Sequence, residues 1–277
     1  MPELFQLGIV EVWQHLLHYL SHQFFFHVVS PSICFPENDI NGSSVGITLA
    51  VGESCSHIND NLQEQARVLF HQWRAGASSA TYKLSDIADI NPETYSPKDN
   101  WSFVNYLDTS SITAGTITEI QYILPSAEKL PSRARRVLRK GDVVFSTVRP
   151  NQLHYGIISN PNTNMLGSTG FSVIRSKMPE LPNEIIYLAL TEPVFVEQMQ
   201  QLAEQSVSTF PSIRPADLDA CVLPMPMEED NNITKTIKII FDTIAENNEV
   251  NLRLVALRDT LLPRLMSGKL DVSVLDI

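Results

Sequence analysis

The stretch from residue 231 to 262 constrains the fold most, because its apolar residues repeat at coiled-coil spacing. The repeat begins with four isoleucines at intervals of four, three and four residues, which places them on one face of a long helix. Asparagines continue this seam, and a polar residue in a seam weakens pairing but fixes register. At about 1.5 Å per residue the helix would be about 48 Å long. The expected seam residues are Ile233, Ile237, Ile240, Ile244, Asn247, Asn251, Leu254 and Leu261.

The segment Arg139–Asn151, Arg-Lys-Gly-Asp-Val-Val-Phe-Ser-Thr-Val-Arg-Pro-Asn, predicts a strand followed by a polar loop. Its Gly-Asp pair is a turn signal, and the Val-Val-Phe run that follows is typical of a strand. Pro150 should end the strand, because proline has no N–H for the ladder. The loop then presents side chains that can read base edges, since Arg pairs with guanine and Asn or Gln with adenine. The candidate base contacts here are Arg149, Asn151, Gln152 and His154.

Positive charge is concentrated just before this loop. From Lys129 to Arg149 the chain has seven Lys or Arg residues and one acidic residue, although its overall formal charge is −11. A compact basic stripe on an acidic protein is a candidate contact for DNA phosphates. The alternative reading is a solvated charged face of a helix. The candidate phosphate contacts are Lys129, Arg133, Arg135, Arg136, Arg139 and Lys140.

Composition limits the class of protein. With 277 residues, 43% hydrophobic and 18% charged, the chain is globular and long enough for one large or two modest domains. The three cysteines, Cys34, Cys55 and Cys221, are scattered without zinc-site spacing, which suits a reducing, cytoplasmic compartment. The acidic balance argues against a free-standing DNA-binding protein and is compatible with a subunit whose partner supplies much of the positive surface.

Residues 1–55 form an atypical N-terminal segment without any Lys or Arg. The segment lacks the basic start of a signal peptide and is too polar and interrupted to span a membrane. Its histidines include three at helical spacing, but no carboxylate or cysteine completes a ligand set, so we predict no metal site. A single strand at 45–51 is expected among loops. The four histidines are His15, His18, His22 and His27.

The rest of the chain predicts an α+β protein with three further parts: a helix and linker at 56–80, a mixed α/β domain at 81–226, and the long helix within 227–273. The first helix should bury Ile58, Leu62, Gln65, Leu69 and Trp73. In the central domain we expect strands at 103–107, 115–120, 143–148, 156–159 and 170–175, and helices at 84–90, 183–190, 193–202 and 216–219. A polar loop at 205–213 adds the candidate base contacts Ser206, Ser208, Thr209 and Arg214.

In this order, the motifs resemble the specificity (S) subunit of type I restriction–modification enzymes from about residue 58 to 273. The similarity is carried by the segments Ile58–Ala66, Leu84–Pro92 (Leu-Ser-Asp-Ile-Ala-Asp-Ile-Asn-Pro), Leu138–Asn151, Ser168–Phe171, Pro211-Ser-Ile, Asp217-Leu, Leu223-Pro-Met-Pro and Leu261-Leu-Pro-Arg-Leu-Met-Ser-Gly-Lys. A full-length member has two target-recognition domains and two long helices. This chain has one such domain and therefore resembles the C-terminal half of an S subunit.

The resemblance implies a role and partners. Each recognition domain in the family reads one half of a split site on double-stranded DNA, and the helices set the spacing between the halves. The family's S subunit docks methyltransferase subunits, which bind S-adenosylmethionine and methylate adenine, and the assembly can recruit restriction subunits. The chain itself should hold no cofactor and catalyse nothing. A lone half could restore two-fold symmetry as a homodimer through 231–262, with 58–73 packed against it, and intramolecular pairing of those two helices is the alternative.

Other functions and other contacts remain open at this point. No Walker loop, GxGxxG or GxSxG motif points to an enzyme, and the adenine-methyltransferase motif is absent. A coiled-coil interaction protein without a DNA role, as a degenerate remnant, is the main alternative and suits the acidic charge. Among the candidate base contacts, Arg149 could instead pair with Asp142, and Arg214 with Asp217.

Overall fold

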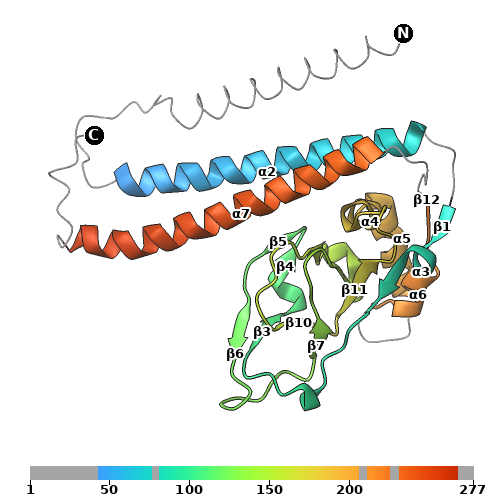
Figure 1. Ribbon diagram of the computed structural model, residues 1–277, viewed down its shortest axis with the longest axis horizontal. Helices are drawn as coiled ribbons and strands as arrows, with labels where there is room; N and C mark the ends of the chain where they lie inside the picture. The colour runs from blue at the N-terminus through green and yellow to red at the C-terminus, as the bar shows by residue number, and fades with distance from the viewer. Residues whose placement is uncertain (1–42, 77–80, 206–210, 225–230, 268–277) are drawn as a thin grey trace, which may run out of the picture. The chain divides into compact units, whose positions relative to one another are not determined.

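A computed structural model describes residues 43–76, 81–205, 211–224 and 231–267 of the chain (Figure 1). The chain divides into two compact units. The larger unit is Asn59–Glu249, and the smaller unit combines Met1–Ile58 with Val250–Ile277. In the smaller unit the described residues form the first part of helix α2 (Ser43–Gly76) and the last part of helix α7 (Asn231–Met266). The candidate site lies in the larger unit.

Two four-stranded sheets form the centre of the larger unit. The first sheet is antiparallel throughout, in the order β2 (Ala88–Ile90), β11 (Phe171–Ser176), β8 (Val143–Ser146) and β9 (Tyr155–Ile157). In the second sheet β3 and β10 run parallel, and its order is β6 (Gln121–Ile123), β3 (Val104–Leu107), β10 (Met165–Ser168) and β7 (Ala134–Val137). The α+β class predicted from the sequence is therefore confirmed.

Short elements connect and close these sheets. Two-stranded ribbons pair β1 (Thr81–Lys83) with β12 (Val222–Pro224) and β4 (Ile112–Thr113) with β5 (Thr116–Ile117). The pairing of β1 with β12 brings the two ends of the central domain together. The remaining helices are α3 (Leu84–Ile87), α4 (Asn183–Leu190), α5 (Pro193–Glu204) and α6 (Pro215–Asp219), with 3-10 turns η1 (Pro97–Asp99), η2 (Thr109–Ser111) and η3 (Pro150–Gln152).

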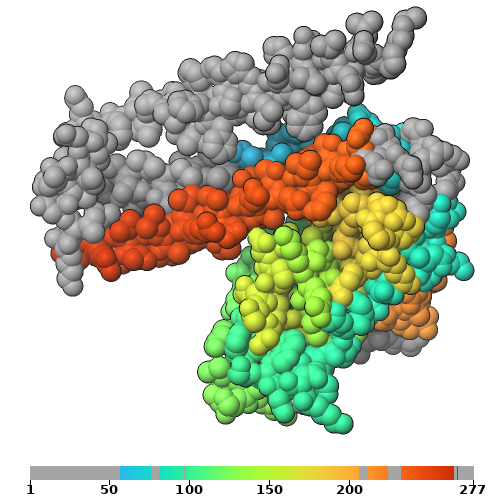
Figure 2. Space-filling model, in the orientation of Figure 1, coloured from blue at the N-terminus to red at the C-terminus, as the bar shows by residue number. Residues whose placement is uncertain are grey.

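One hydrophobic core joins the C-terminal part of α2, the N-terminal part of α7 and the first sheet. Phe70 of α2 and Ile237 of α7 are fully buried in it. Tyr187 of α4 meets Phe241 of α7 edge to face, with ring centroids 5.6 Å apart. Figure 2 shows the start of α7 (orange) directly against the segment that carries α4 (yellow). The two helices are therefore part of the domain's own core.

Within the larger unit α2 and α7 pair in antiparallel directions (Figure 1). Buried Asn59 of α2 donates to the Oδ1 of Asn248 and accepts from the Nδ2 of Asn247, both at 2.8 Å. An amide pair of this kind fixes the register of two helices. The isoleucines of the predicted seam at 237, 240 and 244 are buried in the same core. The intramolecular alternative considered from the sequence is thus observed.

Several predicted elements differ from the structure. The strand at 45–51 was a wrong prediction, because α2 begins at Ser43 and includes it; β-branched residues raise strand propensity without deciding it. The helix at 84–90 ends at Ile87 and continues as β2. Helix α7 continues past Pro263 to Met266, since only one hydrogen bond of the last turn is lost to the missing N–H. In α2, Gln65 of the predicted apolar face is exposed, whereas Ala66 and Phe70, which the sequence places beside that face, are fully buried.

An ionic network holds the turn between β7 and β8. Arg139 binds Glu93 in a bidentate pair at 2.6 Å for both bonds. Arg175 of β11 bridges Glu93 (2.7 Å) and the fully buried Asp142 (2.7 and 2.9 Å). Hydrogen bonds from Arg139 and then Arg175 lower the pKa of Glu93 to about 2. Through Glu93, the network joins Arg139 of the basic segment to Arg175 on strand β11 of the first sheet.

We expect Phe70→Ala to lower the free energy of unfolding by about 3–5 kcal/mol. The substitution leaves a cavity in the core where α2 and α7 pack against the first sheet. Urea unfolding followed by circular dichroism measures the change. Gln72→Ala, an exposed position of the same helix, is the matched control and should shift stability by less than about 0.5 kcal/mol. Equal effects of the two variants would contradict the core described above.

The stability supplied by Glu93 should depend on pH. Its pKa in the folded chain is below the ordinary value of 4.5, so its contribution is fully present above about pH 5 and is lost as pH falls toward 2. Wild type and Glu93→Gln should therefore differ in unfolding free energy at pH 7 and converge at low pH. A difference that stays constant from pH 7 to pH 2.5 would show that the carboxylate charge contributes nothing.

Candidate nucleic-acid interface

The predicted base-reading loop follows β8 and is a single 3-10 turn. Arg149 has a left-handed backbone (φ 47°), and so does Leu153 at the other end (φ 58°). Pro150 is buried, whereas Asn151 and Gln152 are exposed. A left-handed conformation is uncommon for residues other than glycine, and a residue before proline usually has extended backbone. The tight turn therefore directs the two amides outward while the proline anchors the loop.

The loop at Arg149 lies beside residues 211–213, which are the described end of the second predicted loop. Val148 pairs with Ser212 in an isolated antiparallel bridge. The Arg149 N–H donates to the Pro211 carbonyl at 3.0 Å, and the Ile213 N–H donates to the Thr147 carbonyl at 2.9 Å. These bonds join segments about sixty residues apart in the chain. The candidates Ser206, Ser208 and Thr209 fall just outside the described residues, directly before this junction.

Helix α5 and strand β4 contact the loop and the residue that follows it through hydrogen bonds. The Asn151 N–H donates to the Oε1 of Gln200 on α5 at 3.3 Å. The Nδ1 of half-buried His154 lies 2.6 Å from the Ile112 carbonyl and 3.3 Å from the Thr113 hydroxyl. Any base contact by His154 would therefore use Nε2. These contacts fix the loop backbone without the need for a bound ligand.

The alternative pairings have different outcomes. The guanidinium of Arg214 pairs with Asp217, with 2.8 Å from Nη2 to Oδ1, and this hydrogen bond with Arg214 lowers the pKa of Asp217. That pair caps α6, but the arginine remains 81% exposed, so its contact with DNA stays a prediction. Asp142, the other suggested partner, accepts two hydrogen bonds from Arg175.

The basic stripe follows a strand and its flanking turns. Arg135 and Arg136 lie on β7, so the reading as a helix face is wrong. Of the six predicted phosphate contacts, Lys129, Arg133, Arg139 and Lys140 are exposed and the two on the strand are half-buried. The charge of Arg139 is balanced by Glu93.

Arg136 has an unusual environment. Its Nε is buried without a hydrogen-bond partner among the described residues, and burial lowers its pKa. An unsatisfied buried donor is costly, and an anion placed beside the guanidinium would satisfy it. The sequence gives no signal of this, because burial of one strand residue depends on β10 and on the bridge from Arg136 to Thr94.

Two other features bear on function. Among the described residues, no helix has both the length and the apolarity needed to cross a membrane. The same part of the chain contains no group of three His, Cys, Asp or Glu side chains that could hold a metal ion. The four N-terminal histidines lie outside the described residues.

Comparison with known proteins gives one clear sequence match. The chain is 26% identical over 155 residues to the type I restriction enzyme HindI specificity subunit of Haemophilus influenzae, covering 54% of this chain and 34% of that protein. It thus spans about a third of the length of this relative. No protein-family model matches the chain.

Solved S subunits give partial structural matches. The HsdS subunit from Thermoanaerobacter tengcongensis has a TM-score of 0.48 at 22% identity, covering 72% of this chain and 51% of that one. The S subunit from M. genitalium has a TM-score of 0.49 at 14% identity, covering 80% and 58%. The sequence match alone confirms the resemblance that the motifs predicted: the chain is similar, over about half of its length, to a specificity subunit of the type I restriction enzymes.

Proposed function

We propose that the chain is a specificity subunit, or half-subunit, of a type I restriction–modification system and reads one half of a split site on double-stranded DNA. The observation that carries this proposal is the junction of the two predicted base-reading loops. Arg149, Asn151 and Gln152 share one edge of the domain with the segment 211–214. Arg, Asn and Gln are the side chains that read bases bidentately. Side chains from two separate loops can together specify several neighbouring base pairs.

The basic stripe would hold the DNA backbone. Among the described residues, Lys129, Arg133, Arg135 and Lys140 of the stripe form no ion pair. Arg136 has a buried Nε that a phosphate oxygen could accept from. Phosphate contacts of this kind position a protein on the duplex without reading sequence. Arg139 has a different role in this proposal, because its pairing with Glu93 keeps the turn in place.

Helix α7 would set the distance to a second half-site. Its 36 residues give about 54 Å at about 1.5 Å per residue. Its N-terminal part is committed to the chain's own core, so a homodimer would form through the part after Glu249. That part exposes Val250, Leu252, Val255 and Leu257. The partners would be a second copy and the methyltransferase subunits, with restriction subunits joining the assembly.

Catalysis would belong to the partner. In this proposal the methyltransferase subunit binds S-adenosylmethionine and methylates adenine, and the present chain supplies recognition only. The rival is a coiled-coil interaction protein without a DNA role. The net charge of −11 favours that rival, and so does the balancing of Arg139 by Glu93. The salt dependence of DNA binding separates the two.

Neutralising the exposed stripe should weaken DNA binding and its dependence on salt. The logarithm of affinity falls with the logarithm of salt concentration by about 0.9 per phosphate contact. The triple variant Lys129→Gln, Arg133→Gln, Arg135→Gln should therefore have a slope shallower by about 3 in fluorescence anisotropy with duplex DNA. Lys235→Gln, which removes one positive charge from an exposed position of α7 outside the stripe, is the control and should leave the slope unchanged. A wild-type slope near zero would favour the coiled-coil rival.

Base reading should be visible in cells. Deleting the gene, with its neighbouring methyltransferase intact, should abolish adenine methylation at one split motif in a genome-wide methylation map. A palindromic motif would support the homodimer, and an asymmetric one would support pairing with a different half-subunit.

Asn151→Ala should relax the motif at one base pair and weaken binding to the cognate site by about 1–3 kcal/mol. Asn160→Ala, an exposed loop position outside the junction, is the matched control.

An unchanged methylation map after deletion of the gene would contradict the specificity role.

A further inference from the structure

Left-handed backbone gathers at the edge of the domain that carries the turn η3. In the described part of the chain six residues other than glycine have positive φ, and three of them are asparagines, which tolerate this conformation. The other three are Ala114 (φ 47°), Arg149 (φ 47°) and Leu153 (φ 58°). Arg149 and Leu153 are the two ends of η3. Strained backbone of this kind is concentrated at binding sites, where the surrounding structure enforces it.

Ala114 is bonded directly to Leu153. The Ala114 N–H donates to the Leu153 carbonyl at 2.8 Å, and the Gly115 N–H donates to the Tyr155 carbonyl at 2.8 Å. Ala114 and Gly115 (φ 86°) are the two central residues of the turn between β4 and β5. A two-residue turn with positive φ at both positions strongly prefers Asn-Gly, so turn geometry does not account for the alanine. The bonds fasten the tip of the β4–β5 ribbon to the end of η3.

Leu153 and Ala114 form an apolar patch beside the predicted base-reading amides. Leu153 is 37% exposed, and Ala114 is exposed as well. Leu153 directly follows Asn151 and Gln152, whose side chains are exposed. A large aliphatic side chain is therefore held in a strained conformation next to polar groups that can contact DNA bases.

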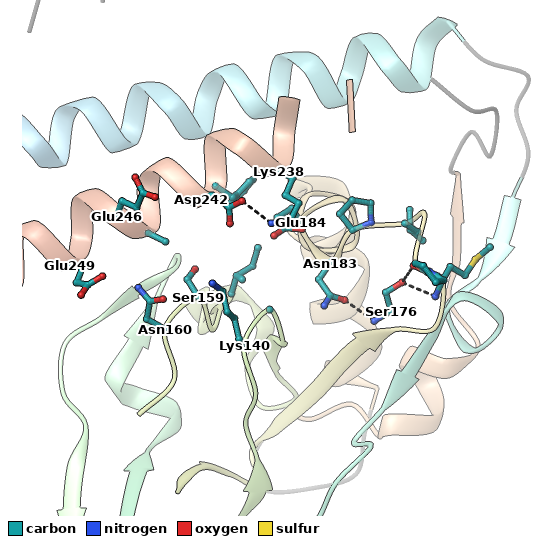
Figure 3. A pocket seen from close by; sticks show the side chains of 18 residues that line it. Lys140, Ser159, Asn160, Ser176, Asn183, Glu184, Lys238, Asp242, Glu246 and Glu249 are labelled. Carbon is teal, nitrogen blue, oxygen red and sulfur yellow. Dashed lines mark hydrogen bonds and ion pairs between the residues drawn. The ribbon is translucent and has the colours of Figure 1, made fainter. Parts of the chain in front are cut away.

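Charge separates this patch from the pocket beside α7. That pocket has four carboxylates and two ammonium groups in its lining (Figure 3). Its net negative charge would repel DNA phosphates, and none of the candidate base contacts lines it. The edge at η3 is therefore the better place to look for further base contacts.

Thymine is the base that suits an apolar side chain. It has a C5-methyl group on its major-groove edge, and apolar contact with this methyl group distinguishes it. Asn151 and Gln152 belong to the residue types that bond adenine at N6 and N7, and adenine pairs with thymine. Neighbouring residues are about 3.8 Å apart along the chain, close to the spacing of about 3.4 Å between base pairs. Leu153 is thus suited to meet a thymine of the same base pair or of the next one.

We propose that Leu153, with Ala114 beside it, reads the 5-methyl group of a thymine in the half-site. This inference rests on the proposed function and adds the kind of base pair that the edge selects. Asn151 or Gln152 bonds the adenine of an A·T pair, and the thymine methyl group packs on Leu153. Because the bonds around Leu153 already fix its backbone, the contact requires little further ordering of the loop.

Replacing thymine by deoxyuridine tests the contact, because it removes the methyl group and keeps every hydrogen-bonding group of the base. The full-length chain first selects its site from a library of randomised DNA duplexes. Each thymine of the selected motif is then replaced in turn, and affinity is measured by fluorescence anisotropy. At one position wild type should bind the uracil duplex about fourfold more weakly, as expected for one buried methyl group. Leu153→Asn should bind the thymine and uracil duplexes equally.

Folding is checked separately by urea unfolding. Leu153→Asn should be at least as stable as wild type, since asparagine tolerates positive φ better than leucine does. The matched control is Leu124→Asn, a leucine that is 41% exposed and lies after β6, outside this edge. It should keep the wild-type preference for thymine.

Equal binding of thymine and uracil duplexes by wild type at every position would overturn this inference and leave the specificity role intact. A selected motif without any A·T pair would do the same, and so would a Leu153→Asn variant that still prefers thymine. Selection of no sequence at all would overturn the proposed function and this inference with it.

Discussion

The packing of two helices onto one sheet is the constraint on which the rest of the larger unit depends. Phe70 of α2, Ile237 of α7 and Tyr187 of α4 meet in a single core, and β1 and β12 close the domain where the chain enters and leaves it. Neither helix can shift along its axis without unpairing Asn59 from Asn247 and Asn248. The edge of the domain that carries Arg149 and Asn151 is consequently held at a fixed place relative to this part of α7.

Charge is used in two distinct ways around this core. Asp142 is fully buried, and Arg175 satisfies it from the neighbouring strand. A buried pair of this kind is costly to break because removing one partner leaves an unpaired buried charge. Glu93 extends the pair to Arg139 at the surface. Part of the basic stripe is therefore structural, and the proposed phosphate contacts would fall to neighbouring stripe residues that form no ion pair within the described part of the chain.

The sequence predicted helices and strands that have a strong local pattern. It missed strands that form only because a neighbouring strand pairs with them. The periodicity of α7 and the Val-Val-Phe run of β8 each identified a real element. Strands β6, β7 and β10 were not predicted, because β7 reads Ala-Arg-Arg-Val and β10 contains Gly167. These residues are strands because of β3 between β6 and β10, a long-range effect that no local propensity encodes.

The same distinction applies to the candidate site. Residue types suited to base reading could be found in the sequence, since Arg, Asn and Gln beside a strand-ending proline form a local motif. The bridge from Val148 to Ser212 could not be found there, because it joins distant segments. The role of Arg139 was also hidden, since its partner Glu93 is 46 residues away. The local sequence thus identifies residue types that could contact DNA. Tertiary structure determines which of their charges are already balanced by an ion pair, as Glu93 balances Arg139.

The two parts of helix α7 lie in different environments. From Ile237 to Ile244 its apolar face must fit the domain core, and after Glu249 it exposes Val250, Leu252, Val255 and Leu257. A helix whose seam is fully used within its own chain has no reason to expose large aliphatic side chains farther along. Asn251 makes the same point, because its Oδ1 is buried without a partner among the described residues. In the homodimer proposed above, this is the segment that would meet the second copy.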